Sequence, residues 1–288
     1  MPSPCAHGKA IIVGEHSVLY GSCAIAAPLP GLKIEVGCSP TVFESSVNTD
    51  GFCGRLRDLP ANFSGISLVA SRLLGAHCAN LHFKSSIPQG AGLGSSAASA
   101  LALARSLNAV LSLNLAEGEV MRICAEAEDA VHGKASGLDL AACASPSPVL
   151  FSGGSALALP PLGAALLVVY SGEAGRTRAA IRKAALCPEK DGIMEGLCRV
   201  CQKAREAWGD PAEVGAQMRK AHRLLCRLGL STPKLEEIVG RCRDLGALGE
   251  KLTGSGLGGC AIGLFEDAPS AKAARRAFEG FDTWVEEI

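Results

Sequence analysis

A glycine-rich stretch at residues 88–99, "PQGAGLGSSAAS", carries the clearest chemical signal in the sequence. Glycines at 90, 92 and 94 allow positive φ angles and bring the backbone close to a ligand without a Cβ clash. The serines that follow precede a run of helix formers, and the N-terminus of a helix presents unpaired N–H groups and a partial positive charge. The stretch therefore predicts that residues 90–96 bind a phosphate chain.

The glycine spacing differs from that of two common phosphate loops. A Walker A loop would have Lys-Ser/Thr after the last glycine, and this sequence does not. A Rossmann fingerprint has another glycine spacing and an acidic residue about 20 positions later. A tight strand-to-helix connection without a ligand is the alternative interpretation, and two further segments argue against it.

Those two segments hold ionisable side chains. "GKAIIVGEHSVLYG" at residues 8–21 places Lys9, Glu15 and His16 around one short strand, and "HGKASGLDLA" places Asp139 in a turn that contains glycine. Between them along the chain, Glu128 lies close to the apolar stripe of a predicted helix. A carboxylate near a buried face needs a partner, and Mg²⁺ is a suitable one.

These side chains require strands and helices to position them. β-rich or alternating runs predict strands over residues 9–14, 33–38 and 81–87. Helical periodicity covers residues 66–78, 95–111 and 115–132. The helix over 95–111 is apolar nearly all round, which predicts that it is buried.

Prolines and a glycine interrupt the regular pattern of strands and helices at "LPPLG", residues 159–163. Beyond it, the pattern predicts a buried strand over 164–172, several helices over 177–248, a glycine-rich stretch "KLTGSGLGGCAIGLF", a helix over 269–278 and a last strand. This order is typical of an α+β domain. We expect two domains, residues 1–160 and 161–288.

Composition excludes several classes of protein. The 288 residues hold 28 basic and 28 acidic side chains, so no overall field attracts nucleic acid or an anionic membrane. No apolar run approaches the roughly 18 residues that span a bilayer. The N-terminus does not read as a secretory signal, which predicts a cytoplasmic protein.

Thirteen cysteines are scattered through apolar segments and form no framework of short loops. Most are expected to be free, buried thiols. Cys198 and Cys201 form a C-x-x-C inside a helical pattern, and no second pair completes four metal ligands. We interpret them as thiols on a helix face and assign no metal there.

Three motifs of the sequence are "GKAIIVGEHSVLYG", "PQGAGLGSSAAS" and "KLTGSGLGGCAIGL". Together they resemble the motifs of the galactokinase, homoserine kinase, mevalonate kinase and phosphomevalonate kinase (GHMP) superfamily, and most closely those of the mevalonate kinase family. Galactokinases normally have Thr-Asp-Tyr after the Glu-His of the first motif, where this chain has Ser-Val-Leu. The second motif resembles the superfamily's phosphate loop and the third, at residues 251–264, its C-terminal glycine-rich motif. The resemblance extends over essentially the whole chain.

The resemblance implies an α+β, two-domain GHMP kinase fold. Its N-terminal ATP-binding domain would be ribosomal-protein-S5-domain-2-like and its C-terminal domain ferredoxin-like α/β, with the active site in the cleft between them. The implied activity is ATP-dependent phosphorylation of mevalonate to 5-phosphomevalonate in isoprenoid synthesis. A homodimer is also implied, and neither nucleic acid nor membrane is an expected partner.

The resemblance also assigns residues. Asp139 would take the proton of the attacking hydroxyl or orient that hydroxyl, and Lys9 would pair with Asp139. ATP phosphates would contact Gly90, Ala91, Gly92, Leu93, Gly94, Ser95 and Ser96. Ser96 and Glu128 would bind Mg²⁺, and mevalonate would contact Glu15, His16 and Thr177, although a helix N-cap is a rival role for Thr177.

Three positions depart from the family pattern. His7 and Ala135 stand where the family usually has proline, and Leu257 interrupts the glycine run of the third motif. A side chain at 257 could narrow the cleft or change the contact with substrate. The alternatives are therefore a related kinase, such as phosphomevalonate kinase or a paralogue acting on another alcohol, or a ligand sensor without turnover.

Overall fold

The computed structural model describes residues 5–132 and 135–288, and it divides the chain into two compact units. The first unit contains the residues up to Gly8, Leu32–Pro88 and Gly94–Ala144; the second contains Lys9–Gly31, Gln89–Leu93 and Ser145–Ile288. The domain boundary expected at 160/161 stays a prediction. None of the helices in the described residues combines the length and apolar character needed to cross a bilayer.

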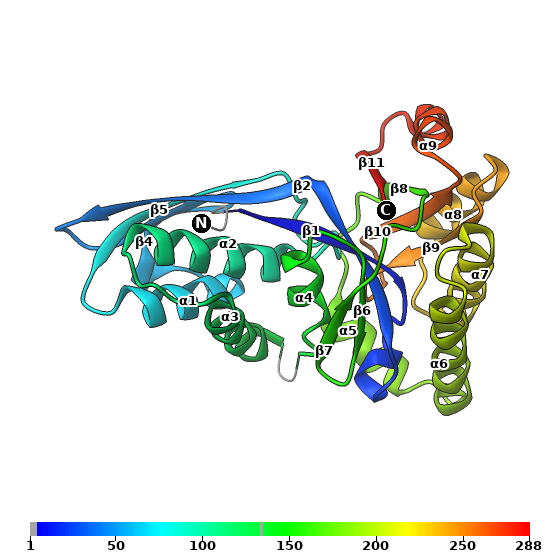
Figure 1. Ribbon diagram of the computed structural model, residues 1–288, viewed down its shortest axis with the longest axis horizontal. Coiled ribbons are helices and arrows are strands. Elements are labelled where there is room, and N and C mark those ends of the chain that lie inside the picture. Colours follow the sequence, from blue (N-terminus) through cyan, green and yellow to red (C-terminus); the bar gives the residue numbers. More distant parts are fainter. Residues whose placement is uncertain (1–4, 133–134) are drawn as a thin grey trace. The chain divides into compact units, whose positions relative to one another are not determined.

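In the first unit, one sheet is covered by helices. Within this unit the strand order is β4-β3-β5-β2, with β5 antiparallel to the second half of β2 and β3 parallel to β5. The seven-stranded sheet continues from the first half of β2 to β6 (Val149–Ser152) and β7 (Ser155–Ala158), and β1 (Cys5–Val13) also pairs with β2. The strands are β2 (Ala24–Thr41), β3 (Ser46–Thr49), β4 (Phe52–Arg55) and β5 (Cys78–Ser85). Figure 1 shows the helices of this unit on one face of the sheet: α1 (Ser64–Leu74), α2 (Ser95–Val110), α3 (Glu117–His132) and α4 (Leu138–Ala144).

Helix α2 is the centre of this unit. It packs against α1, α3 and α4, and its buried residues occupy most of its circumference, as its apolar composition predicted. Helix α3 buries Val120, Ile123, Cys124 and Ala127 on one stripe, and Glu128 lies beside this stripe with 6% of its surface exposed. The apolar periodicity of α3 therefore places a carboxylate in the interior.

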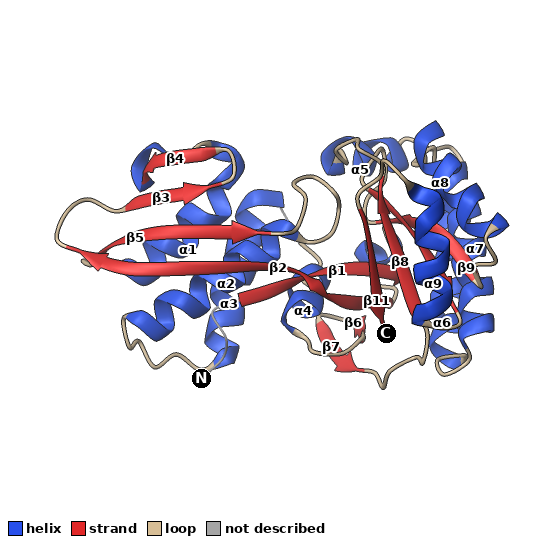
Figure 2. Cartoon of the chain, turned by 90° about the horizontal axis from the view of Figure 1, so that it is seen from above, coloured by secondary structure: helices blue, strands red, loops and turns tan. Residues whose placement is uncertain are grey.

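The second unit contains an antiparallel sheet with strand order β11-β8-β10-β9. Figure 2 shows its long strands beside the helices of the C-terminal half. The strands are β8 (Ala165–Tyr170), β9 (Gly249–Thr253), β10 (Cys260–Phe265) and β11 (Thr283–Glu287). The helices are α5 (Thr177–Ala185), α6 (Lys190–Glu206), α7 (Pro211–Arg227), α8 (Pro233–Asp244) and α9 (Ala268–Arg275).

Local sequence fixes where three of these helices begin. Asp210, Thr232 and Asp267 each cap a helix with a side-chain oxygen, and each helix has a proline in its first turn. The capping oxygen accepts a hydrogen bond from a backbone N–H that has no partner within the helix. Proline suits the first turn because it has no backbone N–H that would need such a partner. The remaining elements are β1 (Cys5–Val13), β6 (Val149–Ser152), β7 (Ser155–Ala158) and the 3₁₀ turns η1 (Ser17–Tyr20), η2 (Leu56–Asp58), η3 (Ala61–Phe63) and η4 (Arg276–Phe278).

A hydrogen-bonded cluster joins α7 to α8. The carboxylate of Glu236 accepts from His222 Nε2 at 3.1 Å, from Cys226 Sγ at 3.2 Å and from the hydroxyl of Ser231. The N–H of Leu252 donates to His222 Nδ1 at 3.3 Å, so Nε2 carries the proton. With Nε2 protonated, the cluster is a network of donors around one carboxylate.

The strands and long helices expected from the sequence are present, with shifted ends. The helix predicted over 66–78 ends at Leu74, because Cys78 already begins β5, and the helix over 269–278 ends as the turn η4. Four short strands, β3, β4, β6 and β7, and the seven-residue α4 were not predicted. All thirteen cysteines are free, but only six of them are buried, fewer than expected.

Candidate active site

The glycines of the phosphate loop have the backbone conformation that their spacing predicted. Gly90, Gly92 and Gly94 have φ angles of 72°, 77° and 78°, and α2 begins at the next residue, Ser95. An amino acid with a side chain rarely adopts such angles, so glycine is strongly favoured at each of these positions. The loop therefore ends directly at the N-terminus of a buried helix.

Two neighbours hold residues 89–93 in the second unit. The N–H of Gly175 donates to the carbonyl of Gly90 at 2.7 Å. Lys9 makes two bonds: its backbone N–H donates to Leu93 O at 2.9 Å and its Nζ donates to Gly92 O at 2.9 Å. Lys9 is only 2% exposed, so its side chain is buried against the loop.

The third glycine motif packs directly on this loop. A Cβ atom at Gly254 would lie 3.1 Å from the carbonyl oxygen of Gly92, and one at Gly259 would lie 2.9 Å from that of Ala91. Real Cβ atoms essentially never come as close as 2.9 Å to another heavy atom, and a contact of 3.1 Å is tighter than most. The second and third motifs of the sequence are therefore parts of one structure, and glycine permits their contact.

Leu257 has a left-handed backbone conformation, which glycine adopts more readily than leucine. Its φ angle is 57°, and its N–H donates to Leu230 O at 2.7 Å. A left-handed conformation costs a residue with a side chain about 1–2 kcal/mol. The third motif therefore holds local strain at this position, and the side chain of Leu257 is half-buried.

Glu15 forms a buried ion pair that the sequence did not reveal. Its Oε1 accepts from Nζ of Lys251, and Lys251 also donates to Leu252 O at 2.6 Å. Burial lowers the pKa of Lys251 and the charge of Glu15 opposes that shift. Lys251 is the first residue of the third motif. Its position in a motif of otherwise uncharged residues was the sequence feature that could have indicated a buried acidic partner. Oε2 of Glu15 has no hydrogen-bond partner among the described residues.

Ser255 connects two of the predicted substrate-binding residues. Its carbonyl oxygen is 2.9 Å from Nε2 of His16, which must donate because a carbonyl only accepts. Its hydroxyl is 3.1 Å from Oγ1 of Thr177. Thr177 is the first residue of α5, whose N-cap is Arg176, so the N-cap role for Thr177 is wrong. Sequence reasoning assigned no role to Ser255, although this residue lies inside the third motif.

His16 is buried and has an unusual backbone conformation. Burial lowers its pKa, and the hydrogen bond to Ser255 offsets part of that effect. Its backbone lies in the left-handed region, with φ of 58°, directly after Gly14 and Glu15. A buried histidine in a strained turn is typical of a functional position, since such strain persists only where the surroundings impose it.

In the first unit, Ser96 and Glu128 are in contact. The Ser96 hydroxyl donates to Glu128 Oε1 at 2.6 Å, although 32 residues separate them. Ser96 is exposed in the first turn of α2, and Glu128 is buried on α3. A hydroxyl and a carboxylate are ligands that Mg²⁺ accepts, so this pair fits a magnesium ion.

Asp139 is the second residue of α4, so the prediction that it lies in the glycine-containing turn itself is wrong. Gly137, with φ of 86°, forms that turn, and the N–H of Leu138 donates to Ser136 Oγ at 3.2 Å. Cys143, four residues after Asp139 and hence on the same face of α4, donates through Sγ to Gly94 O at 3.7 Å. This face of α4 is therefore turned to the start of α2. Residues 133 and 134 lie outside the described residues.

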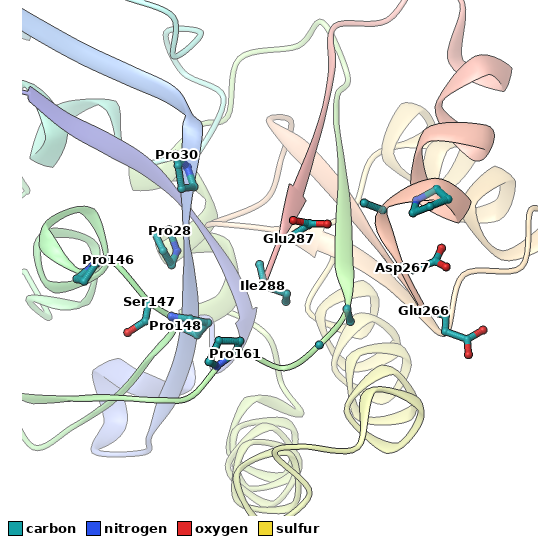
Figure 3. Close-up of a pocket in the computed structure, with 14 residues that line it drawn as sticks. Pro28, Pro30, Pro146, Ser147, Pro148, Pro161, Glu266, Asp267, Glu287 and Ile288 are labelled. Carbon is teal, nitrogen blue, oxygen red and sulfur yellow. The ribbon is translucent and has the colours of Figure 1, made fainter.

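A pocket of about 560 Å³ lies elsewhere in the second unit. Figure 3 shows Pro28, Pro30, Pro148, Pro161 and Ile288 at its wall. None of the predicted site residues is among those that line it. We therefore assign the chemistry to the two groups described above rather than to this pocket.

The chain has relatives of known family. The family described as "GHMP kinases N terminal domain" matches residues 64–146, and "GHMP kinases C terminal" matches residues 193–282. Mevalonate kinase of Aeropyrum pernix is 34% identical over 291 residues, covering 91% of this chain and 88% of its own length.

Two solved structures share the fold. Methanococcus jannaschii mevalonate kinase has a TM-score of 0.85 at 23% identity, covering 99% of this chain and 97% of its own. Streptococcus pneumoniae phosphomevalonate kinase, in complex with phosphomevalonate and AMPPNP, has a TM-score of 0.81 at 21% identity and covers 99% of each chain. The predicted α+β fold is confirmed, and the chain belongs to the GHMP kinase family, alongside the mevalonate kinases.

Proposed function

We propose that this protein transfers the γ-phosphoryl group of ATP to mevalonate and forms 5-phosphomevalonate. The observation that carries this proposal is the 34% identity to a mevalonate kinase over 91% of the chain. The glycine loop and the Ser96–Glu128 pair support it, because phosphoryl transfer depends on positioned phosphates and neutralised charge.

Residues 90–96 bind the phosphates of ATP in this proposal. The positive φ angles of Gly90, Gly92 and Gly94 expose backbone, and the first turn of α2 adds free N–H groups and a partial positive charge. Ser96 and Glu128 hold Mg²⁺, which when bound neutralises charge on the β- and γ-phosphates. The buried position of Glu128 supports this assignment, since a buried carboxylate is stabilised by a cation.

Asp139 accepts the proton of the attacking hydroxyl or orients that hydroxyl. Its place in the first turn of α4, on the face that is turned to the start of α2, supports this role. Lys9 supplies positive charge in the proposed reaction. Its Nζ bond to Gly92 O ties that charge to the phosphate loop.

Glu15, His16 and Thr177 bind mevalonate in the proposal. The free Oε2 of Glu15 can accept a hydrogen bond from a substrate hydroxyl. Ser255 fixes His16 and Thr177, so both side chains are oriented before a substrate arrives. A homodimer and a cytoplasmic location belong to the proposal as well.

A related kinase is the second candidate, because Leu257 interrupts the glycine run of the third motif and phosphomevalonate kinase has the same fold. ADP release can be measured with mevalonate, phosphomevalonate, homoserine and galactose in turn. We expect turnover with mevalonate at a kcat/KM well above the others. Turnover with another alcohol only would replace the substrate, and no turnover with any of them would favour a ligand sensor.

A further inference from the structure

Two cysteines far apart in the sequence are in contact inside the second unit. Sγ of Cys23 lies 2.7 Å from Sγ of Cys201, although 178 residues separate them. Both are free thiols, and both side chains are buried, Cys23 with 8% of its surface exposed and Cys201 with none. The separation is longer than the roughly 2.05 Å of a disulfide bond but requires only a small movement to reach it.

The elements that carry the two thiols are packed together. Cys23 directly precedes β2, at the end of the segment that holds Glu15 and His16, and Cys201 lies on α6. Helix α6 packs on the turn η1 of that same segment. Nζ of Lys190, in the first turn of α6, lies 5.4 Å from the centre of the Tyr20 ring. The thiol contact is therefore part of an extended interface and not a chance approach of two mobile side chains.

The two thiols differ in acidity. The hydrogen bond from Cys201 lowers the pKa of Cys23 to about 7. The same bond, together with burial, raises the pKa of Cys201. At neutral pH, Cys23 therefore has the thiolate that acts as the nucleophile, while Cys201 retains its proton.

From this contact we propose that Cys23 and Cys201 are a redox modification site, at which a peroxide oxidises the two thiols to a disulfide that fixes the Glu15–His16 segment to α6. The Cys23 thiolate attacks the peroxide and breaks its O–O bond, which gives a sulfenic acid and a hydroxide ion; the hydroxide takes up from solvent the proton that the Cys23 thiol had released and becomes the first water. The sulfur of Cys201 then attacks the sulfenic sulfur, the S–S bond forms, and hydroxide leaves with the Cys201 proton as a second water. Two electrons pass from the two thiols to one peroxide.

Thiol counting tests this directly on the unmodified chain. Protein treated with hydrogen peroxide, then freed of it and denatured, should retain two fewer thiols than the thirteen in the sequence. Its intact mass should fall by about 2 Da, and a thiol reductant should restore it. A peptide map without reductant should show Cys23 joined to Cys201. A full count of thirteen thiols, or a bridge between other cysteines, would overturn the proposal.

Variants give a matched comparison. Cys198→Ser removes the half-buried thiol one turn earlier on α6 and should leave the bridge intact, whereas Cys23→Ser and Cys201→Ser should abolish it. The bridge closes a loop of 178 residues, so oxidation should raise the midpoint of thermal unfolding by roughly 5–10 °C. The same rise in Cys23→Ser protein would contradict the proposal. If a variant folds poorly, the thiol count and peptide map of the unmodified chain still decide.

Discussion

Ser96 donates a hydrogen bond to Glu128 at 2.6 Å and thereby joins the exposed first turn of α2 to a buried carboxylate on α3. The two residues are 32 positions apart in the sequence. Their contact places a hydroxyl and a carboxylate oxygen where one magnesium ion can reach both. A substitution in this pair is therefore the most specific test of the proposed metal site.

Glu128→Gln should raise the Mg²⁺ concentration needed for half-maximal rate by at least about tenfold, because the amide retains the shape and the bond from Ser96 but loses the charge. The measurement is the rate as a function of Mg²⁺ at constant ATP. Glu126→Gln is the matched control: it lies two residues earlier on α3, half-buried and paired with Arg122. Equal Mg²⁺ dependence in both variants would refute the metal assignment.

Asp139→Asn should lower kcat by about a hundredfold to ten-thousandfold, the usual contribution of a general base, with little change in ATP affinity. Steady-state kinetics and ATP binding measured by calorimetry check the two parts separately. The control is Asp129→Asn, since its amide oxygen can still accept from the N–H of Ala135 at 2.8 Å. Near-normal turnover of Asp139→Asn would remove this residue from the mechanism.

Lys251→Met should lower the free energy of unfolding by about 3–5 kcal/mol, because it leaves the Glu15 carboxylate buried without its cation. Urea unfolding measures this change. Adding Glu15→Gln to the variant should recover part of the loss, since no charge then remains buried. Strictly additive losses in this double-mutant cycle would show that the two side chains are not coupled.

Gly258→Ala should destabilise the second unit far more than Gly280→Ala. Both glycines have positive φ, which costs alanine roughly 1 kcal/mol or more. A Cβ at Gly258 would also lie 2.7 Å from Ala174 O, whereas nothing lies within 4 Å of one at Gly280. Thermal unfolding of the two variants compares them, and similar midpoints would contradict the close packing of the third motif.

Short-range sequence patterns predicted much of the fold and part of the candidate site. The glycines at 90, 92 and 94 predicted positive φ, and the apolar surface of the following helix predicted its burial. These properties depend on each residue and its near neighbours, so one sequence suffices to read them. The seven-residue α4 was not predicted, because so short a run shows too little periodicity. Asp139 was therefore expected in a turn.

The sequence by itself determined the kinds of residue that could do the chemistry, their order along the chain and the family that they resemble. Only the tertiary structure decided which of them meet: Glu15 with Lys251, His16 and Thr177 with Ser255, and Cys23 with Cys201. The physical reason is that a buried polar group must find a partner, but long-range packing chooses which one. Nothing local to either residue of such a pair records that choice.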